Sequence, residues 1–149
     1  MQKIFENWRG FMVERAGEAN EKDTNQVGLV VVLDSQERAL ILKRSEEVGY
    51  GAGRWSIPGG HIQEEEAFEE GARREVKEET NLEVVNIEHI KSVGRLHYYV
   101  SHGFDGSIKI NFEHTDYAWV SEEELNKYDI IEETKSTLEN LFKIKKKKT

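Results

Sequence analysis

A run of acidic residues constrains this sequence more than any other feature. The segment Pro58–Asn81 reads PGGHIQEEEAFEEGARREVKEETN and carries eight glutamates between positions 64 and 79. From about Glu65 to Thr80 its composition favours an α-helix. Apolar residues recur at i, i+4 and i+8, so one stripe of this helix is expected to pack on a sheet. That stripe consists of Phe68, Ala72 and Val76.

Three of the glutamates share one face of the predicted helix. At about 100° per residue, Glu75, Glu78 and Glu79 fall within an arc of roughly 100° that borders the apolar stripe. Like charges at this spacing repel one another, more strongly when partly desolvated, so a compensating cation is expected. Carboxylate oxygens suit a hard divalent cation, Mg²⁺ above all, and Gly71 leaves room for a close approach. A solvated acidic helix face is the alternative.

Composition limits the classes of protein that this chain can represent. Its 149 residues predict one main domain over residues 25–149, preceded by an N-terminal amphipathic helix and connector over residues 1–24. There is no cysteine, which excludes disulfides, thiolate metal sites and thiol catalysis. The net charge of −8 argues against general nucleic-acid binding. No window holds the ~18 apolar residues of a membrane helix, and a cytoplasmic location is expected.

The apolar stripe of the N-terminal helix has two interpretations. It consists of Ile4, Phe5, Trp8, Phe11 and Met12. A helix docked on the main domain is the simpler interpretation, and a partner or homodimer surface is the other.

The order of the other predicted elements indicates a mixed α/β sandwich. QVGLVVVLD and RALILKR, joined by SQE, are expected to form a β-hairpin. After the acidic helix, EVVNIEHIKSVGRLHYYVS and SIKINF are expected to be strands linked by the turn HGFDG, and DYAWV is a further strand. SEEEL predicts a helix start with a capping box. The last helix is expected to begin near Glu132, with Leu138, Leu141 and Phe142 inward and a frayed lysine-rich end.

The glutamate-rich segment resembles the signature of the Nudix hydrolases. That signature is Gly, five residues, Glu, seven residues, Arg-Glu, apolar, any residue, Glu-Glu, any residue, Gly, apolar. Eight of its nine specified positions match over 23 residues, namely Gly60, Glu66, Arg74, Glu75, Val76, Glu78, Glu79 and Leu82. The exception is Asn81 in place of glycine; Asn tolerates a left-handed backbone, so a helix-ending turn is still expected. Flanking segments also look like the family, so the resemblance covers roughly residues 26–143.

The resemblance implies a Nudix-type α/β/α sandwich with a mixed sheet, and a phosphoanhydride hydrolase with Mg²⁺ or Mn²⁺ as cofactor. Its substrate would be a nucleoside diphosphate linked to a further group. The implied metal ligands are Glu75, Glu78, Glu79 and the carbonyl of Gly60, with Glu78 and Glu79 also counted as catalytic. Glu66 and Arg74 would brace the loop against the helix, although Arg74 could instead contact phosphate.

Two further sets of residues lie outside the signature. Glu113, before the strand that carries Trp119, is similar in placement to a glutamate of many Nudix enzymes and is the expected general base. Glu113 could instead be an ordinary solvated loop carboxylate, with Asp116 or a helix glutamate as the alternative base. Lys43 and Arg44, at the end of a predicted strand, could reach substrate phosphates, although ordinary surface placement would also explain them.

The substrate is less constrained than the reaction. A nucleoside triphosphate or a similar small nucleotide is expected, and ADP-ribose, nucleotide sugars, dinucleoside polyphosphates or a non-catalytic nucleotide-sensing or protein-binding module are the alternatives. The histidines lack zinc-site spacing, although His61 and His114 could assist phosphate binding. The aromatic residues that could stack a base, or simply fill the core, are Tyr50, Trp55, Tyr98, Tyr99 and Phe104.

Overall fold

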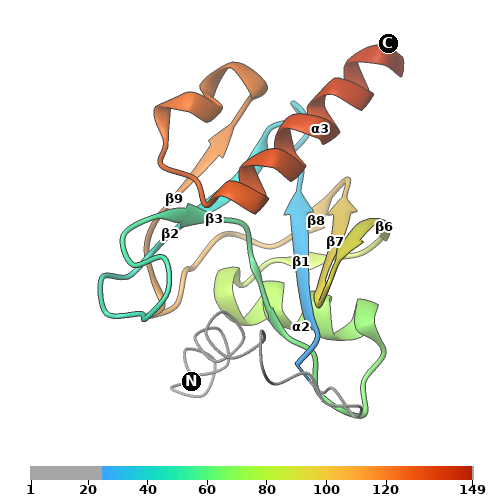
Figure 1. The fold of residues 1–149 in the computed structure, drawn as a ribbon. Helices are drawn as coiled ribbons and strands as arrows, with labels where there is room; N and C mark the ends of the chain where they lie inside the picture. Colours follow the sequence, from blue (N-terminus) through green and yellow to red (C-terminus); the bar gives the residue numbers. More distant parts are fainter. Residues whose placement is uncertain (1–24, 149) are drawn as a thin grey trace.

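The computed structural model describes residues 25–148 and shows a three-layer α/β/α sandwich (Figure 1). Helix α2 (Phe68–Thr80) lies on one side of the strands and helix α3 (Glu132–Lys148) on the other. The predicted helix over residues 1–24 lies outside the described residues. The sandwich confirms the expected fold class.

The strands form a mixed arrangement. In chain order they are β1 (Val27–Val32), β2 (Ala39–Arg44), β3 (Trp55–Ser56), β4 (Gly59–His61), β5 (Glu83–Val84), β6 (Ile87–Val93), β7 (Leu96–Ser101), β8 (Phe104–Asp105) and β9 (His114–Val120). Four strands pair in the order β4-β1-β7-β6, three in the order β3-β2-β9, and β5 pairs with β8. β1 and β7 run parallel, whereas β1 and β4 run antiparallel.

The residues of β1 show why helices cover both sides of the strands. Alternate side chains point to opposite faces. Leu29 and Val31 belong to the core cluster that contains Leu138 of α3, while Val30 and Val32 belong to the cluster that contains residues of α2. Gly28 also faces α2: a Cβ there would lie 3.0 Å from the Cβ of Ala72, so the missing side chain lets the helix approach. A strand that is apolar on both faces requires both layers.

The predicted hairpin of β1 and β2 is wrong. The turn exists, because the Asp34 carboxylate accepts the backbone N–H groups of Gln36 and Arg38 at 2.9 and 2.8 Å. Beyond the isolated bridge between Leu33 and Ala39, however, the strands separate, and β2 pairs with β3 and β9. Each of these two strands pairs along both edges with strands from elsewhere in the chain. A local sequence pattern cannot predict such pairing.

The predicted strand SIKINF, residues 107–112, is also wrong. This segment runs along the C-terminal end of α2. The backbone N–H of Lys109 donates to the Thr80 carbonyl at 2.9 Å, and that of Asn111 donates to the Glu79 carbonyl at 3.3 Å. The last carbonyls of a helix lack partners within the helix. Residues 107–112 donate backbone N–H groups to these carbonyls, so these N–H groups are not available to pair with a strand. β8 falls inside the predicted turn HGFDG and pairs with β5.

Helix α2 begins at Phe68 rather than near Glu65. The Glu66 carboxylate accepts the backbone N–H of Gln63 at 2.8 Å, and such a local bond competes with helix formation. Ala72 and Val76 are buried as expected, but Phe68, the first residue of the helix, is 39% exposed, and its ring contacts the ring of His97. The predicted stripe is therefore wrong at Phe68.

The C-terminal part of the chain follows the expectations except at its lysine-rich end. The backbone N–H of Ser121 donates to the Glu124 carboxylate at 2.9 Å, at the start of the 3-10 helix η1 (Glu122–Lys127). Helix α3 begins at Glu132, and Leu138, Leu141 and Phe142 are buried. It continues to Lys148, so the lysine-rich segment is helical rather than frayed. No helix in the described part of the chain has the length and apolar character needed to cross a bilayer.

Candidate active site

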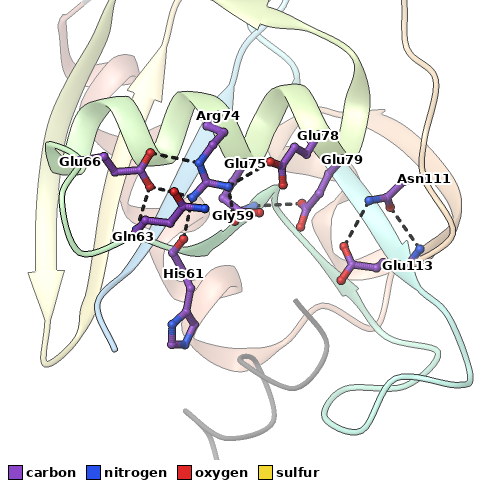
Figure 2. Close-up of polar contacts among 10 residues, drawn as sticks. All are labelled: Gly59, His61, Gln63, Glu66, Arg74, Glu75, Glu78, Glu79, Asn111 and Glu113. Carbon is purple, nitrogen blue, oxygen red and sulfur yellow. Dashed lines mark hydrogen bonds and ion pairs between the residues drawn. The ribbon is translucent and has the colours of Figure 1, made fainter. Parts of the chain in front are cut away.

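Three carboxylates project from the same side of α2 (Figure 2). Glu75 and Glu79 are each only 2% exposed. The side chain of Glu78 is 39% exposed and lies toward the rim of the group. The helical spacing of these residues therefore places two of the three acids in the interior.

The two glycines that precede α2 make this burial possible. The backbone N–H of Gly59 donates to the Glu79 carboxylate at 3.1 Å. A Cβ on Gly60 would lie 2.5 Å from the carboxyl carbon of Glu75, closer than any real side chain permits. The glycine pair therefore lets backbone and carboxylates share a space that no side chain could enter.

Arg74 ties the signature loop to the helix (Figure 2). Its guanidinium contacts both oxygens of Glu66, at 2.7 and 3.1 Å, and donates to the His61 carbonyl at 3.0 Å. The same group lies 3.2 Å from Glu75 and 3.1 Å from Glu78. A planar fork suits such shared contacts, which fix the guanidinium among three carboxylates.

Glu113 approaches this group from outside the helix. It is 2% exposed and contacts the amide of Asn111, as Figure 2 shows. Arg44, at the end of β2, is 3% exposed and is held by a hydrogen bond from its Nε to the Tyr50 carbonyl at 2.8 Å. Its positive charge acts on both Glu79 and Glu113. Glu113 and Arg44 thus belong to the same buried region as the α2 acids.

The ionisation of these acids is strongly perturbed. Burial raises the pKa of Glu75 to about 8, and the charges of Glu78 and Glu113 add to the rise while Arg74 opposes it. Burial, with Glu75 and Glu113, also raises the pKa of Glu79 well above its usual value. Burial raises the pKa of Glu113 to about 7. Near neutral pH the group therefore holds protons or requires a cation.

The donor atoms fit the divalent cation that the signature implies. Oε1 of Glu75 and Oε2 of Glu113 are buried and accept no hydrogen bond from the described residues. Buried oxygens of this kind are ligands or acceptors for a hard cation and its waters. Within residues 25–148, no three acidic or histidine side chains are gathered closely enough to enclose an ion in this conformation. The Glu78 carboxylate, which contacts Arg74, would have to turn to complete the set.

The positions of the other predicted residues give less support to a role in the site. Lys43 follows Leu42 in β2, so by strand alternation it lies on the same side as Ile41, whose core cluster contains Leu138 of α3. Asp116 is exposed and accepts the backbone N–H of Tyr117 at 2.8 Å. His114 is buried, and burial lowers its pKa to about 3. His61 contributes a backbone carbonyl to the network around Arg74.

The candidate base-stacking residues are mostly engaged with the core. Tyr98 and Tyr99 are 1% and 2% exposed and belong to the two core clusters. Trp55 packs edge-on against Tyr128, and Phe104 stacks on Trp119. The core interpretation therefore holds for the two tyrosines.

Sequence reasoning missed two contributors to the site. Gly59 was not expected to bind the Glu79 carboxylate through its N–H group, although its position beside Gly60 pointed to a close approach. Asn111 was not considered, because a single Asn in a predicted strand carries no pattern. Its contact with Glu113 depends on the path of residues 107–112 along α2.

Comparisons with known proteins agree with this geometry. The NUDIX domain model matches residues 23–141. Nucleoside triphosphatase NudI of Escherichia coli is 32% identical, with 66% of this chain and 84% of NudI covered. Oxidized purine nucleoside triphosphate hydrolase of Mus musculus is 48% identical over 56 residues, which cover 38% of this chain and 34% of the mouse protein.

A solved structure supports the same assignment. The MutT protein of Methanosarcina mazei superposes with a TM-score of 0.64 and 26% identity, with 81% of this chain and 94% of that chain covered. Because the family model spans most of the sequence, the chain belongs to the NUDIX domain family and is an enzyme of its pyrophosphohydrolase class.

Proposed function

We propose that this enzyme hydrolyses a phosphoanhydride bond of nucleoside triphosphates with Mg²⁺ as cofactor. The observation that carries the proposal is the buried group of Glu75, Glu79 and Glu113, in which two oxygens accept no hydrogen bond from the described residues. The names of the mouse hydrolase and of NudI support a nucleoside triphosphate as the substrate.

The metal would be held by Glu75, Glu78, Glu79 and the carbonyl of Gly60. When bound, it would supply positive charge against the phosphates and a bound water of lowered pKa. The chain's own part is to keep these ligands fixed: Gly59 orients Glu79, and Arg74 braces Glu66 and the loop against α2. Mn²⁺ is a suitable substitute, since it accepts the same oxygen ligands.

Glu113 is the proposed general base. A base works best when its pKa lies near the operating pH, and burial raises the pKa of Glu113 to about 7. Its Oε2 is buried and accepts no hydrogen bond from the described residues, so this oxygen can receive a proton from the attacking water. Arg44 is proposed to meet substrate phosphate, because its charge reaches Glu79 and Glu113 from the end of β2.

A substrate panel tests the proposal. The protein is incubated with Mg²⁺ in ¹⁸O-labelled water with NTPs, dNTPs, oxidised dNTPs, ADP-ribose, nucleotide sugars and dinucleoside polyphosphates, and products are identified by mass. We expect a triphosphate to be the best substrate, with the label on a single product that names the attacked phosphorus. If a nucleotide of another class is hydrolysed at least tenfold more efficiently, the substrate assignment is wrong. If no compound is hydrolysed, the reaction assignment is wrong.

A further inference from the structure

Asn111 forms a two-point contact with Glu113. Its side-chain amide donates to Oε1 of Glu113 at 3.3 Å, and its Oδ1 accepts the backbone N–H of Glu113 at 3.1 Å (Figure 2). The second bond fixes the orientation of the amide, because a flipped amide would place two donors face to face. The NH₂ group is therefore directed at the carboxylate.

The same residue is attached to α2. The backbone N–H of Asn111 donates to the Glu79 carbonyl at 3.3 Å. Glu79 is one of the proposed metal ligands, and its carboxylate is fixed by Gly59 at 3.1 Å. Asn111 thus connects Glu113, the proposed base, to the helix that carries the proposed metal ligands. The backbone of this link is also held by the Ser45 N–H, which donates to the Glu113 carbonyl at 2.8 Å, and by the His114 N–H, which donates to the Asn111 carbonyl at 3.1 Å.

The contact uses only one oxygen of the carboxylate. Oε1 of Glu113 is engaged by Asn111, while Oε2 is buried and accepts no hydrogen bond from the described residues. A glutamate side chain has three rotatable bonds, so an undirected carboxylate would sample several positions. Because proton transfer needs the acceptor within hydrogen-bond reach of the water, a fixed carboxylate with one available oxygen is the useful arrangement.

From these contacts we infer that Asn111 is a positioning residue, which holds the Glu113 carboxylate against the α2 acids with Oε2 available to receive a proton. The inference rests on the proposed function, since it assigns a purpose to the proposed base. Asn111 itself does not touch substrate. It acts through Glu113, and this dependence can be measured.

A double-mutant cycle tests the inference. Asn111→Ala and Asn111→Asp are each made in the wild-type protein and with Glu113→Gln, and turnover is measured with Mg²⁺ and the best of the eight common NTPs and dNTPs. We expect Asn111→Ala to lower kcat by about 10- to 100-fold, with KM changed less than about threefold. In the Glu113→Gln background the same change is expected to lower kcat by less than about twofold, because the residue to be positioned is already impaired.

The aspartate variant separates positioning from a purely structural role. Asn111→Asp keeps the acceptor for the Glu113 N–H but replaces the NH₂ donor with a negative oxygen. We expect it to be at least as impaired as Asn111→Ala. Wild-type kcat in Asn111→Asp, or an equal loss from Asn111→Ala in both backgrounds, would show that Asn111 only maintains the loop.

The outcomes distinguish this inference from the proposed function. If Glu113→Gln retains kcat within about threefold of wild type, the base assignment fails and the positioning role fails with it. If Glu113→Gln is impaired while Asn111→Ala is not, only the role of Asn111 is wrong. Asn81→Gly is the matched control, because it removes another amide contact of the same segment, from Asn81 to the Ser107 carbonyl at 3.2 Å. It should leave kcat unchanged.

Amide hydrogen exchange adds a readout that does not require turnover. Asn111→Ala is expected to accelerate exchange of the Glu113 amide proton, whose acceptor it removes, and Asn81→Gly is not. Unchanged exchange of this proton in Asn111→Ala would mean that the contact does not form in solution, and the inference would be abandoned.

Discussion

At the scale of single residues, the buried acids lower the free energy of unfolding, because a charged carboxylate loses its hydration when it is buried. Glu75 and Glu79 are each 2% exposed, and burial raises the pKa of both. Arg74 and Arg44 offset part of this cost. A chain shaped by stability alone would place apolar or exposed residues here. This cost is consistent with the proposed function, in which a cation offsets the charges of these acids.

The raised pKa values predict how the metal-free protein responds to pH. Because the folded-state pKa of Glu75 is about 8 and that of Glu113 about 7, the folded protein binds more protons than the unfolded chain above the usual carboxyl pKa. Stability should then fall as the pH rises. In EDTA we expect the Tm to fall between about pH 7.5 and about pH 9, because above about pH 7.5 His114, whose pKa burial lowers to about 3 in the folded protein, is mostly neutral in the unfolded chain as well.

A substitution identifies the source of this slope. Glu79→Gln removes one of the coupled acids, so in EDTA its Tm should equal or exceed that of wild type and should vary less with pH. A Tm for wild type that rises steadily across the same range would contradict the assigned pKa shifts.

The role of Glu113 is tested at the same scale. Glu113→Gln keeps the shape and loses the proton acceptor, so we expect kcat to fall by roughly 10² to 10⁴, with a smaller effect on KM and none on folding. Steady-state kinetics between about pH 6 and about pH 9, on the best substrate, measure this. A loss below about threefold would reduce Glu113 to a bystander or return the base to α2.

At the scale of elements, α2 shows which features a local pattern can predict. Its composition, its two buried apolar positions and its left-handed end at Asn81, where φ is 69°, follow from the sequence. The acids Glu75, Glu78 and Glu79 were also predictable, since helical spacing alone places them on one face. The pairing of β1 and β2 and the path of residues 107–112 were not, because both depend on partners far along the chain.

Asn81 gives a prediction about the end of this helix. A left-handed conformation costs an alanine roughly 1 to 2 kcal/mol relative to glycine. We expect Asn81→Ala to destabilise the protein by about 1 kcal/mol and Asn81→Gly to be close to neutral, as measured by urea unfolding. Equal stability of the two variants would show that the turn at Asn81 is not constrained in solution.

At the scale of the whole molecule, the sandwich explains how an acidic protein can handle an anionic substrate. The chain has a net charge of −8, so attraction of phosphate cannot come from the overall charge. In the proposed function it comes from local cations, namely Arg44 and the proposed metal. The layer of strands positions Arg44, which belongs to β2, and helix α2, which carries the proposed metal ligands and packs closely on Gly28 through Ala72.

Metal binding should therefore be visible in global stability. If Mg²⁺ binds the folded cluster as proposed and does not bind the unfolded chain, millimolar Mg²⁺ is expected to raise the Tm of wild type. Glu70, exposed on the first turn of α2, provides the control: Glu70→Gln should respond like wild type, and Glu79→Gln should respond less. Equal responses of all three proteins would mean that Mg²⁺ binds elsewhere.

Turnover at saturating Mg²⁺ in Glu79→Gln, compared with Glu70→Gln, tests the central claim most directly. Both substitutions remove one negative charge from α2, but only Glu79 lies in the buried group. If that group holds the metal for phosphoanhydride hydrolysis, Glu79→Gln should lower kcat by several orders of magnitude while Glu70→Gln stays within about twofold of wild type. Near-normal kcat in a folded Glu79→Gln protein would contradict the assignment of the active site.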